Sequence, residues 1–549
     1  MTRPGPPVAA AAAAGLALAD GAVVVLALPQ ILNELDASVQ SVAGVIGAYT
    51  LALALALPLA VAGVKRAGPA RSAGIAILAF AAAGAICGLA NEMELLIAMR
   101  AVQGAAGAAV LAAAFVLLDA GRPRSGGRTA WVAVAVFGAA AGPALGGVLT
   151  QVFEWRAVFL AQVPVLLVAG LICLRDTEQA VPPPAASGES PRRAWALLAL
   201  GLLSAALTGV LFLLVLLLVS GWALSPLAAA AVVSVLPAAA LAGTRIAGDD
   251  TVRAVAGSLL VAGGVAALAF LPLDAVAATL IPQLVAGLGM GMSLPALAGG
   301  LSSERTVGDA AGLLGARHLG ITVALAILAT VAAAQLDAAE IEVRERGAAV
   351  ILDARLPPLD KLGLVQVAAG ELDSVAPRAA LRDALEDAGE GEEHDALSRS
   401  VDDTLVGAID DAFRPAFLIC GAMALLAALA LTASAPGRPG RPALAAAAVA
   451  LILIAGQAVV NSAVRPDPVE ITDPCGDREL PGTGGLDGFV QDQALRALDR
   501  AACSAGSSRE ELALALVDAD SAERFEREHG SNPRDALGPV GALLELLGG

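Results

Sequence analysis

Residues 8–31 read VAAAAAAGLALADGAVVVLALPQI, and Asp20 is their only charged residue. An apolar run of this length can cross the hydrocarbon core of a bilayer as a helix, because about 20 residues suffice. Twelve further runs of this kind follow in the chain, at 40–64, 72–91, 94–119, 129–150, 156–174, 194–220, 225–246, 253–273, 275–300, 309–334, 414–433 and 442–464. The sequence therefore predicts an all-α polytopic membrane protein with thirteen spans.

The composition excludes several classes of soluble protein. Of the 549 residues, 57% are hydrophobic and only 15% are charged, against about a quarter in a globular domain. The net charge of −17 disfavours a nucleic-acid partner. No CxxC or HExxH metal-binding motif occurs. A nucleotide-binding P-loop has no candidate lysine, since the only lysines are Lys65 and Lys361. We expect no cofactor, no metal and no enzyme activity. A membrane glycosyltransferase that uses Asp518-Ala-Asp520 is the one enzymatic alternative.

The distribution of charge predicts how the chain is oriented in the cell membrane. Lys and Arg gather in alternate loops, first at Lys65, Arg66 and Arg71, and this places the N-terminus in the cytoplasm. An odd number of spans then places the C-terminus outside. Residues 335–413 and 465–549 carry net charges of −12 and −9, so the rest of the chain is at +4. We interpret both acidic stretches as exoplasmic modules and as candidate surfaces for an exoplasmic partner.

These observations divide the chain into six parts. They are an N-terminal six-helix bundle (1–174), a cytoplasmic linker (175–193), a C-terminal six-helix bundle (194–334 and 414–433), an acidic helical insertion (335–413), an extra transmembrane helix (442–464) and an exoplasmic C-terminal domain (465–549). Leucines 381 and 385 have the spacing of an amphipathic helix within the insertion. Cys475 and Cys503 are the only cysteines outside the spans, and we expect them to form a disulfide in an oxidising compartment.

Three segments of the first half resemble the drug:proton antiporter branch of the major facilitator superfamily, especially its fourteen-span relatives. The first span contains Ala19-Asp20-Gly-Ala-Val-Val-Val-Leu-Ala-Leu28-Pro29, and the fourth contains Arg100-Ala-Val-Gln103-Gly104-Ala-Ala-Gly107. The fifth contains Gly138-Ala-Ala-Ala-Gly142-Pro143-Ala-Leu-Gly146-Gly147, which is similar to the antiporter motif. The resemblance implies two six-helix bundles, to which this chain adds one helix, and proton-coupled efflux of a small molecule across the lipid bilayer.

The resemblance also implies a gating loop between the second and third spans. Here this loop includes Gly63, Lys65, Gly68 and Arg71, and Lys65 stands where the family has an acidic residue. Residues 312–320 resemble part of the family's second half, and we group their Arg317 with the gating residues. Because the acidic residue of the loop is absent, a transport-inactive protein that displays exoplasmic domains as a sensor or assembly partner is the main alternative.

Ionisable groups inside apolar helices are the candidates for coupling to protons. Asp20 and Arg100 lie within predicted spans, where an unpaired charge costs at least ~2.5–3.5 kcal/mol at the bilayer centre. Desolvation favours a neutral carboxyl, so Asp20 can take up and release a proton, and the fixed charge of Arg100 can tune it. The alternative is a static structural pair. Polar residues expected along the substrate path are Thr50, Gln103, Gln162, Thr208, Gln283 and Ser293, although each can instead form a bond between helices.

Overall fold

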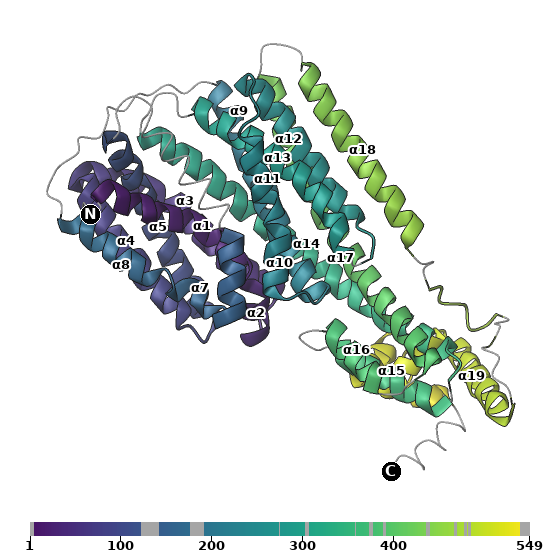
Figure 1. Cartoon of the computed structure of the whole chain (residues 1–549). Coiled ribbons are helices and arrows are strands. Elements are labelled where there is room, and N and C mark those ends of the chain that lie inside the picture. The colour runs from purple at the N-terminus through teal and green to yellow at the C-terminus, as the bar shows by residue number, and fades with distance from the viewer. Residues whose placement is uncertain are drawn as a thin grey trace. The chain divides into compact units, whose positions relative to one another are not determined.

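The computed structural model describes residues 5–121, 142–175, 191–273, 275–301, 307–356, 358–372, 377–387, 391–434, 440–465, 469–476, 480 and 485–537. Regular secondary structure in these ranges is helical, without a strand (Figure 1). Twelve helical segments among them are long and apolar enough to cross a membrane. The predicted all-α polytopic fold class is therefore confirmed. The span expected at 129–150 begins outside the described residues, and residues 142–153 are helical.

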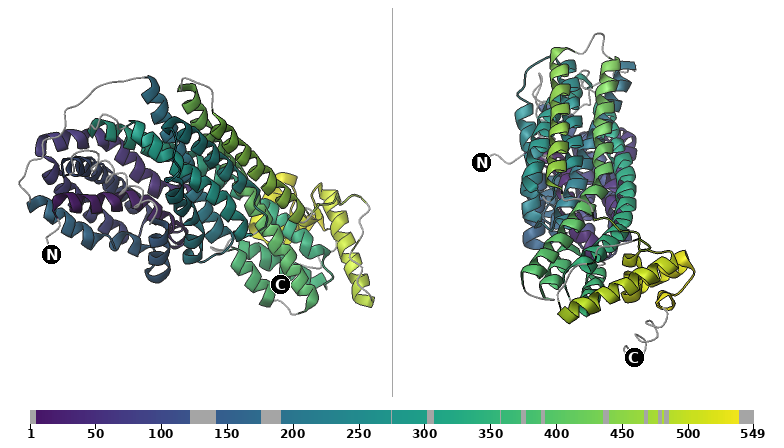
Figure 2. Two further views of the ribbon diagram at one scale, coloured as in Figure 1. Left: turned by 45° about the horizontal axis from the view of Figure 1, so that its top comes forward. Right: turned by 90° about the vertical axis from the view of Figure 1, so that its right-hand side faces the viewer.

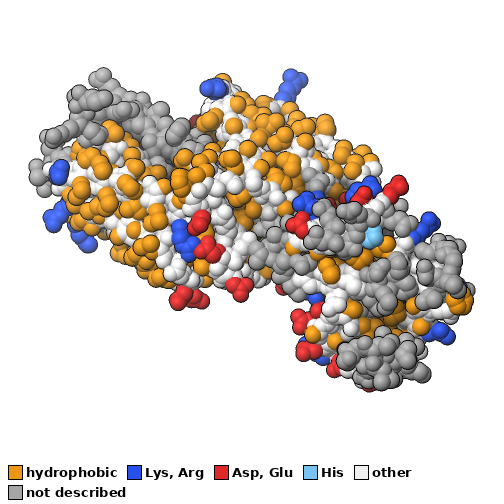
Figure 3. Space-filling model, turned by 60° about the horizontal axis from the view of Figure 1, so that its bottom comes forward, with side chains coloured by type: hydrophobic (Ala, Val, Ile, Leu, Met, Phe, Trp, Pro, Cys, Tyr) orange, Lys and Arg blue, Asp and Glu red, His pale blue; other side chains and the backbone are white. Residues whose placement is uncertain are grey.

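The chain forms two compact units. We call Met1–Ser220, Leu224–Ala333 and Phe413–Ala463 the membrane unit, and Gly221–Ala223, Ala334–Ala412 and Val464–Gly549 the hydrophilic unit. Hydrophobic side chains dominate the face of the membrane unit visible in Figure 3. Many of them, such as Leu55, Leu59 and Ile452, are exposed. A surface of this kind is stable against lipid rather than water.

The first half of the membrane unit contains α1 (Pro6–Val25), α2 (Leu28–Glu34), α3 (Val39–Ala67), α4 (Pro69–Gly88), α5 (Met93–Gly121), α7 (Arg156–Leu160) and α8 (Val163–Arg175). The run at 8–31 is therefore two helices and not one. Pro29 lies in the first turn of α2. Because proline has no N–H and its ring crowds the preceding turn, the first turn of a helix accommodates it without the loss of a hydrogen bond. The span predicted near 8–31 is present as α1, and the short helix α2 follows it.

The second half contains α9 (Pro191–Leu216), which continues as a π-helical turn (Leu217–Gly221), α10 (Pro226–Val233), α11 (Val235–Gly243), α12 (Asp250–Ala267), α13 (Val276–Leu301) and parts of α14 (Val307–Asp353) and α17 (Glu392–Ser434). The additional helix α18 (Arg441–Val464) runs along the outside of this half (Figures 1 and 2). Ala446 packs against Ala256 and Met292, and Gln457 donates to the carbonyl of Ala278 at 2.7 Å. Helix α18 is thus attached to α12 and α13 by one face.

Helices α14 and α17 are far longer than a membrane span, with 47 and 43 residues. The sequence prediction ended the span at Ala334, whereas α14 continues to Asp353. The continuation is rich in Ala, Glu and Arg, which favour helix, and an ion pair one turn apart joins Glu340 to Arg344 at 3.0 Å. Hydropathy marks where a span ends but does not mark where its helix ends.

The hydrophilic unit adds α15 (Pro358–Leu372), α16 (Pro377–Asp387), α19 (Gly485–Ala505), α20 (Arg509–Val517), α21 (Ala519–His529) and α22 (Pro533–Ala536). The two acidic stretches were treated as separate modules, but they pack as one body. Arg509 donates to Asp353 at 2.8 Å, and Leu352 shares a core with Leu495. Cys475 and Cys503 form a disulfide.

Candidate functional site

The centre of the first half is an ion pair between Asp20 on α1 and Arg100 on α5. Nη1 of Arg100 lies 2.5 Å from Oδ2 of Asp20, and both side chains are fully buried. The other carboxylate oxygen of Asp20 accepts from Nε2 of Gln162 at 3.2 Å. Burying two charges costs several kcal/mol each unless good geometry and further hydrogen bonds compensate. Both oxygens of Asp20 therefore have partners in this state.

Arg100 has more contacts than Asp20, and they hold its guanidinium in place. Its Nε donates to the carbonyl of Val45 at 3.1 Å, and Nη1 also donates to Oε1 of Gln103 at 2.6 Å. Its guanidinium carbon lies 4.4 Å from the centre of the Tyr49 ring. Nη2 of Arg100 and Nε2 of Gln103 have no hydrogen-bond partner among the described residues. An unsatisfied buried donor costs about 1–3 kcal/mol. A rearrangement that gives these two donors hydrogen-bond partners would therefore stabilise the network.

Glycines of the fourth-span element bring α5 close enough to α3 for these contacts. A Cβ atom on Gly104 would lie only 2.1 Å from the backbone oxygen of Tyr49. A Cβ atom on Gly107 would lie 3.1 Å from the Tyr49 hydroxyl. Glycine at these two positions therefore allows the Tyr49 ring to reach Arg100.

The antiporter motif packs against α1 in the same way. Gly138 lies outside the described residues, whereas Gly142, Pro143, Gly146 and Gly147 belong to the helical segment 142–153. Cβ atoms on Gly142 and Gly146 would come within 2.6 Å of Ala22 and 2.5 Å of the Val23 carbonyl. A Cβ atom on Gly147 would come within 2.1 Å of Ala230 on α10. One helix thus contacts both α1 and the second half of the membrane unit at close range.

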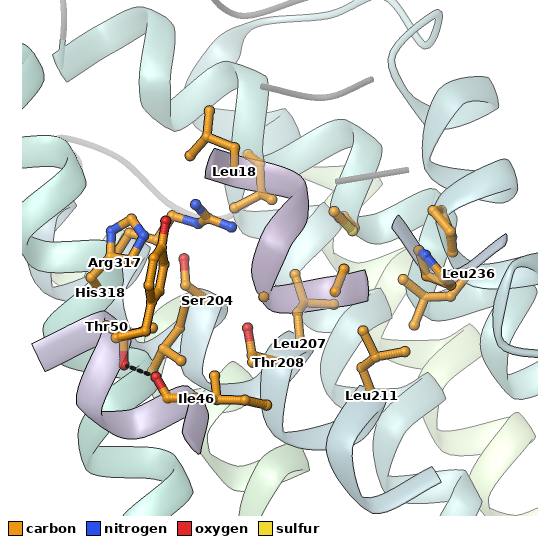
Figure 4. Close-up of a pocket in the computed structure, with 18 of the residues that line it drawn as sticks. Leu18, Ile46, Thr50, Ser204, Leu207, Thr208, Leu211, Leu236, Arg317 and His318 are labelled. Atoms are coloured by element: carbon orange, nitrogen blue, oxygen red, sulfur yellow. Dashed lines mark hydrogen bonds between the residues drawn. The ribbon is translucent and has the colours of Figure 1, made fainter. Parts of the chain in front are cut away.

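A cavity of about 110 Å³ lies between the two halves of the membrane unit (Figure 4). Its walls are mostly apolar, with Leu18, Leu207, Leu211 and Leu236 among them. Helix α1 presents residues 17, 18, 21 and 22 to the cavity, while its Asp20 belongs to the ion pair. Tyr49 also lines the cavity, and its hydroxyl donates to the Ala17 carbonyl at 2.8 Å. The ion pair and the cavity therefore share α1 and Tyr49.

The cavity contains two of the six residues expected along the substrate path, Thr50 and Thr208. Thr50 lines it, and the Thr50 hydroxyl lies 2.8 Å from that of Thr322 on α14. Gln103 and Gln162 belong instead to the network of Asp20 and Arg100. Gln283 is buried on α13, where it donates to the hydroxyl of Thr279 at 3.1 Å. A substrate path along the residues outside this cavity stays a prediction.

Arg317 is not in a loop, although the sequence analysis grouped it with the gating residues. It lies within α14 and lines the cavity, next to His318. Nδ1 of His318 lies 2.8 Å from the Leu314 carbonyl, which fixes the ring. Sequence reasoning did not find His318 or Ser204, another lining residue. The Arg317-His318 pair inside the apolar run 309–334 was a signal that could have identified His318, whereas Ser204 on α9 has no such signal.

The other gating residues lie where α3 meets α4. Gly63 and Lys65 belong to α3, and Arg71 belongs to the first turn of α4. Gly68 alone joins the two helices and has φ +83°, a conformation that favours glycine. The side chains of Lys65 and Arg71 are exposed. The short joint between α3 and α4 therefore depends on Gly68.

Two helical halves around a central cavity, with a buried charge pair beside it, are the architecture of a membrane transporter. The chain belongs to the Major Facilitator Superfamily, whose family model matches residues 10–329. The resemblance to the drug-efflux branch is confirmed by relatives. The tetracenomycin C resistance and export protein of Streptomyces glaucescens is 35% identical over 181 residues, 32% of this chain and 34% of the relative. The puromycin resistance protein of Streptomyces alboniger is 36% identical over 162 residues, 29% and 32% of the two chains.

These matches cover about a third of the length of each curated relative. Solved structures share the fold over more of the chain. A bacterial homolog of the human lysosomal transporter Spinster, in an inward-facing and unoccupied conformation, gives a TM-score of 0.55 at 15% identity, over 79% of this chain and 98% of its own. The nucleoside transporter NupG gives 0.52 at 11% identity, over 78% and 100% of the two chains. At these identities the likeness concerns the fold alone.

Proposed function

We propose that this protein exports a hydrophobic or amphiphilic small molecule in exchange for protons, by alternating access around the central cavity. The observation that carries the proposal is the fully buried pair of Asp20 and Arg100 beside that cavity. The relatives named for resistance to tetracenomycin C and puromycin favour export, and they do not favour the transport-inactive alternative. Tetracenomycin C is a reasonable first test substrate.

Asp20 is the group that would carry the proton. An ionised Asp20 attracts Arg100 at 2.5 Å, whereas a protonated Asp20 loses the charge that compensates the guanidinium. Protonation and a stable ion pair therefore compete. Gln162 can hydrogen-bond either form, because its amide donates to a carboxylate and accepts from a carboxylic acid.

The shared helix gives the proton site a way to affect the cavity. A change at Asp20 acts on α1, whose neighbouring residues Leu18 and Gly21 line the cavity. Tyr49 provides a second connection, since it contacts Arg100, binds the Ala17 carbonyl and lines the cavity. The close packing of Gly142 against Ala22 limits the directions in which α1 can move. Coupling then follows from a small set of direct contacts.

We further propose that the protein resides in the cell membrane with its N-terminus in the cytoplasm and its hydrophilic unit outside. The helix ends support this orientation: Lys65 and Arg66 end α3, and Arg175 ends α8. The opposite ends of the first helices carry Glu34 and Asp36. A cytoplasmic excess of Lys and Arg is the general rule for membrane proteins.

The test compares Asp20→Asn with Asp36→Asn in sealed inverted vesicles. Asp36 is exposed and has φ +45°, a conformation that asparagine tolerates. Asp36→Asn therefore removes the same charge at a site outside the ion pair. We expect tetracenomycin C to release protons from vesicles with wild-type protein and with Asp36→Asn, but not with Asp20→Asn. Proton release that persists in Asp20→Asn would remove Asp20 from the mechanism. Arg100→Lys should also lose coupling, because an ammonium lacks the planar fork that binds Asp20, Val45 and Gln103 together.

A further inference from the structure

We propose that the central cavity recognises an amphiphile that carries an anionic group, a carboxylate or a phenolate, and that Arg317 binds this group. The inference rests on the proposed function in taking the cavity as the substrate site, and it adds the chemical class of the substrate. It concerns the cavity and not the proton-carrying pair, so the two can be tested separately.

The charge of the cavity wall is the first argument. Twenty described residues line the cavity, and none of them is Asp or Glu. Arg317 is the lining residue with a permanent positive charge. Asp20 does not line the cavity, and its charge is paired with that of Arg100. A cationic substrate would therefore meet a like charge, and an anionic one an opposite charge.

The state of Arg317 is the second argument. Within the part of the chain that the structure describes, neither an ion pair nor a hydrogen bond engages its side chain. Figure 4 shows the guanidinium extending into the space between Leu18 and Ser204. Arg317 is partly buried, so an anion that binds there meets a donor fork that is less hydrated than one on the surface.

Two hydroxyl groups, those of Ser204 and Thr208, also line the cavity, and together with Arg317 we call them the polar corner. Ser204 and Thr208 lie one turn apart on α9 and face the cavity (Figure 4). Among the described residues, no partner engages either side chain. The hydroxyl of Thr50, in contrast, is bound to the Ile46 carbonyl and to Thr322. Ser204 and Thr208 are therefore the hydroxyls available to donate to the second oxygen of an anionic group.

The remaining walls define the rest of the substrate. Leucines 207, 211 and 236 form apolar surfaces opposite or beyond the polar corner (Figure 4). An apolar body is favoured there because its burial removes hydrocarbon surface from water. The combination of one cation, two hydroxyls and apolar walls is matched by an aromatic or aliphatic body with a single acidic end.

The experiment uses two dyes with the same xanthene rings and opposite charge, fluorescein (an anion) and rhodamine 123 (a cation). Their binding to the purified full chain in phosphatidylcholine nanodiscs is followed by fluorescence anisotropy, without any proton gradient. We expect saturable and tighter binding of fluorescein. Arg317→Gln should weaken fluorescein binding by roughly tenfold or more, as the loss of a charged hydrogen-bonded partner does. Arg317→Lys should retain the preference for the anion with reduced affinity.

Arg245→Gln is the matched control, because Arg245 is exposed and lies outside the cavity. It should bind both dyes as the wild type does. A second measurement needs no variant: fluorescein, and not rhodamine 123, should slow the modification of Arg317 by phenylglyoxal in the wild-type chain, as read by mass spectrometry. The inference is overturned by absence of saturable fluorescein binding, by tighter binding of rhodamine 123, by unchanged affinity in Arg317→Gln, or by no protection of Arg317. None of these results affects the role of Asp20, whose test is proton release.

Discussion

The guanidinium carbon of Arg100 lies 4.4 Å from the centre of the Tyr49 ring, so a residue of the cavity wall also contacts the buried ion pair. The same tyrosine donates its hydroxyl to the Ala17 carbonyl on α1. Arg100 attracts the ring through its quadrupole, and this contact strengthens when water is excluded. Tyr49 is therefore placed to sense both the charge of Asp20 and the content of the cavity.

The first prediction concerns this tyrosine. Tyr49→Phe removes the bond to Ala17 and keeps the ring beneath Arg100, so we expect a loss of about 1 kcal/mol in unfolding free energy and weaker proton coupling. Tyr49→Leu also removes the cation–π contact and should lose about 0.5–2 kcal/mol more. Thermal unfolding of the purified protein and proton release in vesicles measure the two effects. Wild-type behaviour of Tyr49→Phe would show that the hydroxyl is not part of the coupling.

The second prediction concerns the approach of α5 to α3. Gly104→Ala places a Cβ atom 2.1 Å from the backbone oxygen of Tyr49, and a backbone atom cannot move aside as a side chain can. We expect a loss of about 1–3 kcal/mol or failure to fold, as for overpacked cores. Gly47→Ala on α3 is the control, since nothing lies within 4 Å of its Cβ position. That variant should be neutral or stabilised by up to about 1 kcal/mol, because alanine favours helix. Equal stabilities of the two variants would contradict the packing argument.

Much of the fold could be predicted from the sequence because spans depend on a local property. Apolar length identified the membrane helices, and the rarity of charges in them identified Asp20 and Arg100 individually. Their pairing could not be read from the chain, since 80 residues separate them and no local rule places α1 beside α5. Hydropathy likewise cannot show that a new helix, α2, begins at Leu28-Pro29, because the run around them is apolar throughout.

The cavity was harder to predict than the ion pair. In the sequence, a buried amide such as Gln162 or Gln283 is a polar residue in an apolar span, and a residue that lines a path looks the same. Only the tertiary contacts show that Gln162 binds Asp20 and that Gln283 binds Thr279. Arg317 lies within the predicted span 309–334, and the sequence does not show that its side chain lines a cavity. The union of the two acidic stretches into one unit depends on contacts between distant residues, such as Arg509 with Asp353.

The third prediction is a pH dependence in the hydrophilic unit. Burial lowers the pKa of Lys361 from 10.5 to about 8, with Asp353 opposing the shift and Arg509 adding to it. The side chain is 1% exposed, and Nζ donates to the Leu352 carbonyl at 2.6 Å. Between pH 8 and 10.5 the unfolded unit binds more protons than the folded one, so stability rises with pH across this window. The gain should reach up to about 3 kcal/mol.

Trp222 can report this change, because it is buried in the hydrophilic unit and its Nε1 donates to Asp410 at 2.9 Å. We call the full chain with Phe at the other three tryptophans the Trp222 reporter. Its urea midpoint should increase from about pH 7.5 to 10, and Lys361→Met should flatten the increase. A midpoint that falls with pH in the reporter, or a rise that Lys361→Met preserves, would assign the effect to other groups.

The fourth prediction joins the disulfide to the topology. Cys475 and Cys503 are 28 residues apart, and closing a loop of this length should contribute about 3–4 kcal/mol by constraining the unfolded chain. Replacing both with serine in the Trp222 reporter should lower its unfolding free energy by about that amount. The free cysteines, Cys87, Cys173 and Cys420, are all buried, so they do not compete for a polar thiol reagent.

Intact cells then decide which side of the membrane the hydrophilic unit occupies. A membrane-impermeant maleimide should label Cys475 and Cys503 only after reduction, because a disulfide does not react and an exoplasmic unit is reached from outside. The serine double variant should stay unlabelled under both conditions, which excludes reaction at the three buried cysteines. Labelling without reduction would show that the two thiols are free in the cell. Labelling only in inverted vesicles would place the hydrophilic unit in the cytoplasm and overturn the proposed orientation. The role of the Asp20–Arg100 ion pair in coupling is tested separately, by proton release.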